Sequence, residues 1–147
     1  MQNLTASAVI SFSEALEDQA AEFYTRLSKV AEGERELFLK FAKESGKNKV
    51  RIVRTYQETI SDALEACFAF EGLNLSDYKV STDLPAGASQ ADLLKTALDL
   101  ETNAITFYLT AAERSKALMA TIPGAFKGVA RRRSKRKAEL ESMLAAT

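Results

Sequence analysis

Two stretches of this sequence, residues 17–24 (EDQAAEFY) and 101–108 (ETNAITFY), share the pattern E-x-x-A-x-x-F-Y. The glutamate, alanine and aromatic positions of the pattern lie three or four residues apart, so they fall on one side of a helix. A pattern that occurs twice at this distance indicates an internal repeat. It predicts two related helical hairpins around a pseudo-twofold axis.

Working outward from the two stretches, apolar residues recur at helical spacing over about 7–31, 34–70, 89–117 and 124–145. Gly33 separates the first two predicted helices, and Pro123 with Gly124 separates the last two. Ser89 is a predicted N-cap, with Asp92 three residues later. We therefore predict an all-α, antiparallel four-helix bundle, a single domain over 1–147, made of hairpins at about 7–70 and 89–145 and a long crossover at about 71–88.

The composition is that of a soluble globular protein, with 46% apolar and 27% charged residues among 147 and a formal net charge of zero. No apolar run approaches the roughly 20 residues of a membrane span, and the N-terminus does not resemble a signal peptide. These features predict a cytoplasmic protein without a membrane partner. The single cysteine, Cys67, lies in an apolar stretch and is interpreted as a core residue.

The repeated E-x-x-A-x-x-F-Y motif resembles the first helix of each hairpin in the rubrerythrin branch of the ferritin-like di-iron proteins. That resemblance covers nearly the whole chain and implies that Glu17 and Glu101 face the bundle centre. The family's second helices carry Leu-Ala-x-x-Glu-x-x-His. Aligning that motif on residues 41–42 and 129–130 places four other residues at its Glu and His positions, namely Ser45 and Asn48 in one hairpin and Arg133 and Arg136 in the other.

The chain has no histidine, so the Glu-x-x-His ligands implied by the resemblance are absent. Arginine stays charged and only donates hydrogen bonds, so it repels a metal cation. We therefore predict a degenerate site without a cofactor, in which arginines pair with the glutamates. Tyr24 and Tyr108 are interpreted as core aromatics with hydrogen-bonded hydroxyls. The predicted buried polar cluster consists of Glu17, Glu101, Arg133, Arg136, Ser45, Asn48, Tyr24 and Tyr108.

The leading hypothesis for function is a non-catalytic structural or interaction module, predicted to be a homodimer with an unknown protein partner. One alternative is a metal-binding oxidoreductase or iron-handling protein that uses Glu17, Glu101 and Glu44. Another is nucleic-acid binding through the fourth helix, where seven bases and no acid occur between Lys127 and Lys137. The neutral chain and the absence of a DNA-reading motif argue against nucleic acid as a partner.

Overall fold

The computed structural model describes residues 4–59, 69–70, 72–115 and 121–147. Four long helices make up most of this part of the chain, which confirms the prediction of an all-α fold with four helices. Two-residue strands and short 3-10 turns complete it. In chain order the elements are β1 (Leu4–Thr5), α1 (Ala6–Val30), η1 (Glu32–Glu34), α2 (Arg35–Thr59), β2 (Ala69–Phe70), η2 (Leu75–Tyr78), α4 (Gln90–Ser115) and α5 (Thr121–Ala145).

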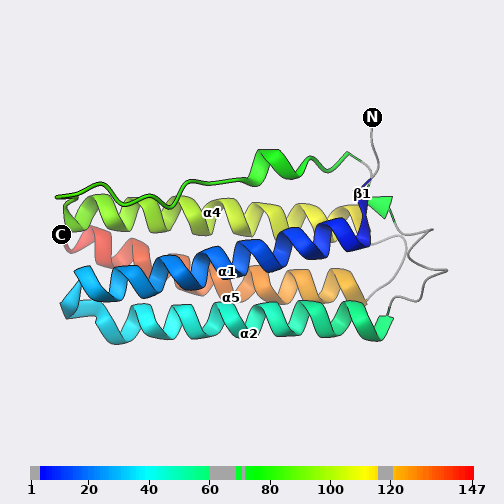
Figure 1. The fold of residues 1–147 in the computed structure, drawn as a ribbon, viewed down its shortest axis with the longest axis horizontal. Coiled ribbons are helices and arrows are strands. Elements are labelled where there is room, and N and C mark those ends of the chain that lie inside the picture. Colours follow the sequence, from blue (N-terminus) through cyan, green and yellow to red (C-terminus); the bar gives the residue numbers. More distant parts are fainter. Residues whose placement is uncertain (1–3, 60–68, 71, 116–120) are drawn as a thin grey trace.

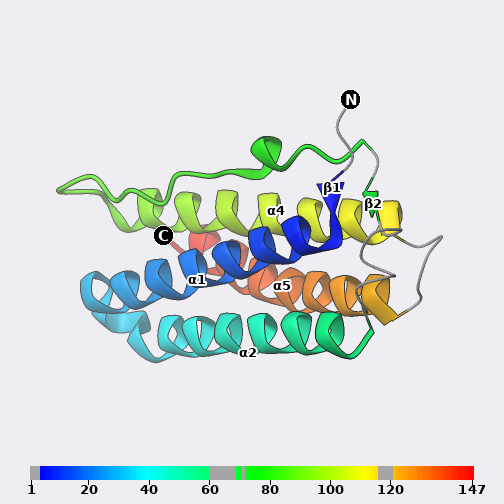
Figure 2. The same ribbon diagram turned by 45° about the vertical axis from the view of Figure 1, so that its right-hand side comes forward.

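The four helices lie lengthwise beside one another, so that each of them borders a common core (Figure 1). The closest packing is within the pairs α1–α2 and α4–α5, and α2 also packs along α5. Figure 2 shows the same neighbours from a second side, with α5 alongside α2. The pairing of consecutive helices agrees with the repeat in the sequence, because each repeat supplies one pair.

The core is built from the apolar positions that recur at helical spacing. Phe23, Leu27, Phe107 and Phe126 are completely buried, and each such side chain stabilises the fold by about 1.5–3 kcal/mol. Val30 has the helical spacing of these core residues and is expected to point inward, but it is 61% exposed because it is the last residue of α1. Cys67 lies outside the described residues.

The N-terminal end of the bundle shows where the predicted second helix was too long. Its extension to residue 70 is wrong, because Ala69–Phe70 form β2, which pairs antiparallel with β1. The register places Leu4 opposite Phe70, whose ring is buried and packs edge-on against Phe126 at 6.4 Å. The pairing of β1 with β2 therefore holds the start of α1 next to residues 69–70.

The last helix begins three residues earlier than predicted. Pro123 and Gly124, which we expected at the break, lie in the first turn of α5. Proline is tolerated there because the first N–H groups of a helix have no intrahelical partner. No helix in the described ranges has a stretch that is both long enough and apolar enough to cross a lipid bilayer.

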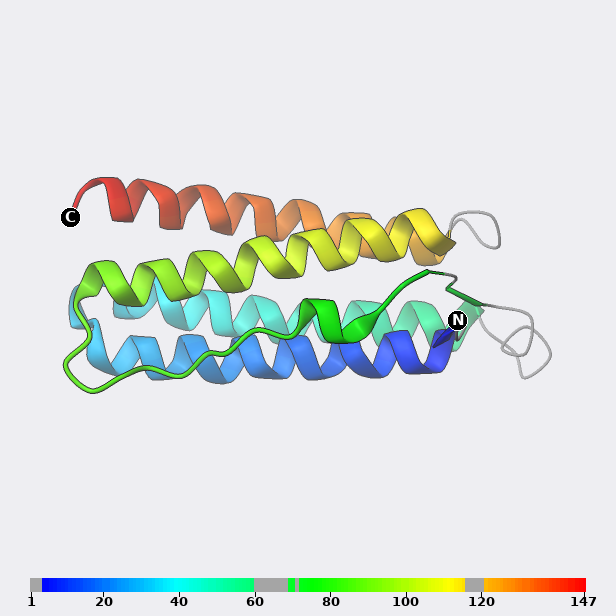
Figure 3. The same ribbon diagram turned by 90° about the horizontal axis from the view of Figure 1, so that it is seen from above.

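Residues 72–89 run the length of the bundle past α1 and α4 (Figure 3). Side chains of both helices hold the backbone of this segment: Gln19 donates to the Val80 carbonyl at 2.8 Å, and Asn103 donates to the Tyr78 carbonyl. The Tyr78 ring also packs edge-on against Phe107, with centroids 5.6 Å apart. These contacts explain how a segment outside the four long helices stays on the surface of two of them.

Ser89 and Asp92 cap the start of α4 reciprocally. The Asp92 N–H donates to Ser89 Oγ at 3.1 Å, and the Ser89 N–H donates to Asp92 Oδ2 at 3.3 Å. We expect Ser89→Ala to lower the free energy of unfolding by about 1 kcal/mol, since an N-terminal donor loses its acceptor. Ser142→Ala, at an exposed position of α5, is the control, with an expected change within about 0.5 kcal/mol. Equal effects of both changes in urea unfolding would contradict the cap.

Candidate functional site

A cluster of polar side chains lies inside the bundle, and every helix contributes to it. Each of its members is at most 2% exposed. The contributions from α1 and α4 are equivalent, because each gives a glutamate and a tyrosine seven residues, or two turns, apart. We call the cluster the central network; it consists of Glu17, Tyr24, Ser45, Asn48, Glu101, Tyr108, Arg133 and Arg136. The structure thus brings together all eight residues of the predicted cluster.

Arg133 binds two carboxylates from different helices with a single guanidinium group. Its Nη2 and Nε donate to the two oxygens of Glu17 at 2.9 and 3.1 Å, in a bidentate arrangement. Its Nη1 donates to Glu101 Oε1 at 2.6 Å. The planar fork of arginine suits this double engagement, which a lysine could not provide.

Arg136 lies one turn further along α5 and completes the charge balance. Its Nη1 donates to Glu101 Oε2 at 3.3 Å and to Ser45 Oγ at 3.0 Å, and its Nη2 donates to the Phe41 carbonyl at 3.3 Å. Its guanidinium carbon is 5.2 Å from the centroids of both the Tyr24 and Phe41 rings, which allows cation–π attraction. Arg136 thereby joins α5 to α2 as well as to α4.

The two tyrosines cross over between the helix pairs. Tyr24 of α1 donates to Glu101 Oε2 of α4 at 2.6 Å, and Tyr108 of α4 donates to Glu17 Oε2 of α1 at 2.5 Å. Burial, followed by the negative charge of the adjacent glutamate, raises the pKa of both phenols well above the ordinary range. Both hydroxyls therefore stay protonated and act as donors to the carboxylates.

The network is electrically neutral, with two carboxylates and two guanidinium groups. Burial by itself would raise the pKa of Glu101, but Arg133, Arg136 and the hydrogen bond from Tyr24 together lower it. Burial would likewise lower the pKa of Arg133, but Glu101 and Glu17 raise it well above its usual range. Glu101 and Arg133 therefore keep each other charged in a place where an isolated ion would be too costly to bury.

The donors around the glutamates do not fit a di-iron centre. All four carboxylate oxygens already accept hydrogen bonds, including one from Asn48 Nδ2 to Glu17 Oε1 at 3.4 Å. Across the described ranges, no three His, Cys, Asp or Glu side chains group closely enough to hold a metal ion. Glu44, the third carboxylate of the alternative metal set, therefore does not join Glu17 and Glu101; it lies within electrostatic reach of Arg132 instead.

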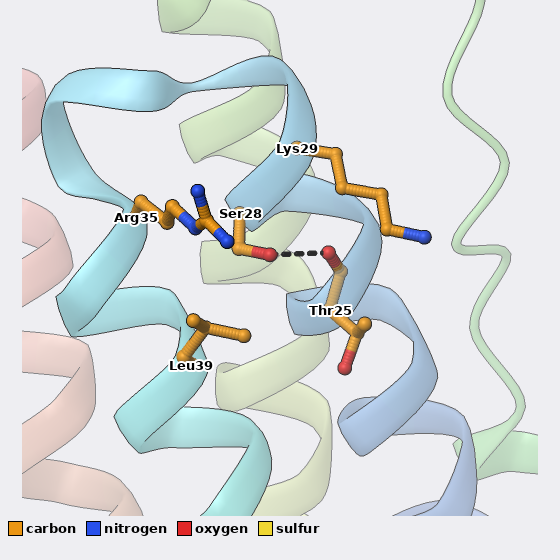
Figure 4. Close-up of a pocket in the computed structure, with 5 residues that line it drawn as sticks. All are labelled: Thr25, Ser28, Lys29, Arg35 and Leu39. Carbon is orange, nitrogen blue, oxygen red and sulfur yellow. Dashed lines mark hydrogen bonds between the residues drawn. The ribbon is translucent and has the colours of Figure 1, made fainter.

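A surface pocket at the turn between α1 and α2 lies apart from the network. It is lined by Thr25, Ser28, Lys29, Arg35 and Leu39. Figure 4 shows the Ser28 hydroxyl directed at the Thr25 carbonyl, to which it donates at 2.5 Å, while the Lys29 side chain extends away from Arg35. The pocket contains no residue of the central network, so the predicted site has no opening there.

Some features of the network could not be read from the residue pattern. Arg136 contacts the Phe41 carbonyl and the rings of Tyr24 and Phe41. These contacts depend on how the helices pack, and no sequence motif marks them. Among the described residues, Asn48 Oδ1 and Arg136 Nε are buried polar atoms of the network that have no hydrogen-bond partner. A buried polar atom without a partner costs stability.

Comparison with known proteins adds no relative: no family model, curated protein or solved structure matches this chain. The likeness to rubrerythrins therefore stays a prediction from the repeated motif. The function has to be inferred from the geometry of the network and of the surface.

Arg133→Met should lower the free energy of unfolding by about 3–5 kcal/mol, because it leaves two buried carboxylates with only one cation. Arg131→Met, at the exposed position two residues earlier, is the matched control and should change it by less than about 0.5 kcal/mol. Adding Glu17→Gln to Arg133→Met should recover much of the loss, since the remaining Glu101–Arg136 pair is neutral. An unchanged melting temperature for Arg133→Met would contradict the bridging role.

Tyr24 and Tyr108 should make stability fall at alkaline pH. Their pKa values are raised in the folded protein, so their contribution is complete below about pH 10, where unfolded tyrosine ionises, and is lost as pH rises above it. Thermal unfolding between about pH 8 and about pH 11 should show a weaker alkaline decline in Tyr24→Phe/Tyr108→Phe than in the parent protein. The prediction would be contradicted if all four tyrosines showed full phenolate absorbance at alkaline pH while the circular dichroism spectrum remained that of the folded protein.

Proposed function

We propose that this chain is a degenerate, rubrerythrin-like member of the ferritin-like bundles, in which an arginine–glutamate network takes the place of a di-iron centre. It acts as a non-catalytic structural or interaction module. The observation that carries the proposal is that Arg133 engages both Glu17 and Glu101, the two residues that the repeated motif marks as ligands. A cation of the protein itself neutralises the carboxylates there.

The positions of the other network residues support the same origin. In the di-iron carboxylate bundles, two helices each give one Glu and two others give Glu-x-x-His, all projecting inward. Here Ser45 and Asn48 on α2, and Arg133 and Arg136 on α5, have that spacing of three and are buried beside the two glutamates. An ancestral ligand set replaced at four positions accounts for this arrangement of polar residues inside a bundle.

The groups of the central network are also poorly suited to catalysis. The two phenols are held protonated and the two carboxylates are engaged by hydrogen bonds, so neither type of group is available as a base or nucleophile. The central network contributes order to the bundle, and any interaction has to occur at the surface.

The test is to restore the ligand set. The variant Ser45→Glu, Asn48→His, Arg133→Glu, Arg136→His should bind Fe(II) or Co(II), with a melting temperature that rises on adding the metal. The parent protein, expressed in iron-rich medium, should hold only substoichiometric iron and lack ferroxidase activity.

A control variant with similar side-chain sizes but without ligands, Ser45→Gln, Arg133→Gln, Arg136→Asn, should show no metal-dependent stabilisation. If the restored variant is unfolded without metal, addition of Co(II) should refold it, as in other proteins whose folding is coupled to metal binding. A restored variant that gains neither structure nor stability from either metal would count against the ferritin-like origin. Stoichiometric iron in the parent protein would count against the loss of the centre.

A further inference from the structure

Charge is distributed unevenly over the four helices. Helix α2 carries seven bases and three acids, and α5 carries seven bases and two acids, which gives these two helices a net charge of +9. Helices α1 and α4 each carry four acids and two bases, a net charge of −4 together. The central network takes two acids from α1 and α4 and two bases from α5. The remaining charge is +7 on α2 and α5 and −2 on α1 and α4.

The two basic helices lie side by side, so their exposed bases occupy neighbouring parts of the surface, which we call the basic face. Their contact is set in the interior by the hydrogen bond from Arg136 to Ser45, and at one end by a 3.1 Å hydrogen bond between the hydroxyls of Thr59 and Thr121. Lys49 of α2 is not part of this face, because it forms an ion pair with Asp18 of α1. The basic face consists of exposed side chains of both helices: Lys40, Lys43, Lys47, Arg51, Arg54, Lys127, Arg131 and Lys135.

Bases from the two helices come close enough to repel one another. Partial burial and the neighbouring guanidinium groups of Arg51 and Arg131 lower the pKa of the half-buried Arg132, against a smaller opposite effect of Glu44. Like charges held together cost free energy in the isolated protein. An anionic partner would relieve that cost and gain from the same charges.

We propose that the basic face of α2 and α5 binds the phosphate backbone of double-stranded nucleic acid without reading its sequence. This inference names a partner for the interaction module proposed above and rests on that proposal. It uses surface side chains only, however, so its failure would leave the account of the central network unaffected. The neutral net charge of the chain does not exclude such a partner, because the surplus of bases lies on α2 and α5 and the surplus of acids on α1 and α4, although α2 and α5 also carry five acids between them.

The shape and composition of the face favour a duplex. Twenty-five residues of helix extend over about 37 Å, the length of about 11 base pairs, and α2 and α5 both have this length. The exposed large apolar residues in the described ranges are Val30, Leu39, Val50 and Leu109, and none is aromatic. Single strands are bound largely by stacking on aromatic rings, and membrane surfaces by inserted apolar and aromatic residues.

The experiment measures fluorescence anisotropy of a labelled duplex of about 24 base pairs, as DNA and as RNA, titrated with the full chain at increasing salt concentrations. The face variant is Lys47→Gln, Arg51→Gln, Lys135→Gln. The control variant removes the same charge elsewhere: Lys29→Gln, Lys79→Gln, Lys95→Gln, at exposed positions of α1, the surface segment and α4. Circular dichroism checks that both variants keep the fold.

The parent protein should bind duplexes of unrelated sequence with similar affinity. At about 50 mM salt the face variant should bind at least about tenfold more weakly, and its slope of log K against log salt should be less steep by about two to three. The control should keep the slope of the parent. No duplex binding, equal weakening by both variants, or binding only to vesicles rich in anionic lipid would each overturn the proposal. Preference for DNA or RNA identifies the duplex recognised.

Discussion

The structure depends on one guanidinium group. Arg133 lies completely buried between Glu17 of α1 and Glu101 of α4, and donates to both. Two carboxylates this deep in a bundle could not remain charged without a cation, and the arginine would be equally costly without them. Each helix therefore has to present its charge at the same level of the bundle. That requirement relates α1, α4 and α5 to one another more strictly than apolar packing would.

The other members of the network extend this constraint to the remaining helix and across the two halves. Arg136 reaches Ser45 and the Phe41 carbonyl on α2, and the tyrosines donate across the bundle in opposite senses. The crossing gives physical meaning to the repeat in the sequence, since each half supplies the donor for the carboxylate of the other. A buried ion pair does not necessarily stabilise more than apolar residues would, but it disfavours any arrangement that separates the charges.

One basic stretch serves two purposes through helix geometry. Residues 131–137 span almost two turns, so they point in all directions around α5. Arg133 and Arg136 point inward and neutralise the glutamates, while Arg131 and Lys135 are exposed. Arg132 lies within electrostatic reach of Arg51 of α2. The inner pair contributes nothing to the field outside because it is neutralised. The positive potential of the outer charges is increased by the neighbouring helix α2, which is itself basic.

Helical periodicity, the repeated E-x-x-A-x-x-F-Y and the inward phase of Arg133 and Arg136 were all readable in the sequence, because local spacing decides which side of a helix a residue occupies. The four helices of the described ranges follow from them, and the membership of the central network follows from them together with the resemblance of residues 41–48 and 129–136 to a second-helix motif. The strand pairing of Phe70, the crossed hydrogen bonds and the basic face of α2 and α5 do not. These features depend on which helices are neighbours and on how they are shifted relative to one another along the bundle axis. Only the packed structure determines both, because these contacts join residues that are distant in the chain.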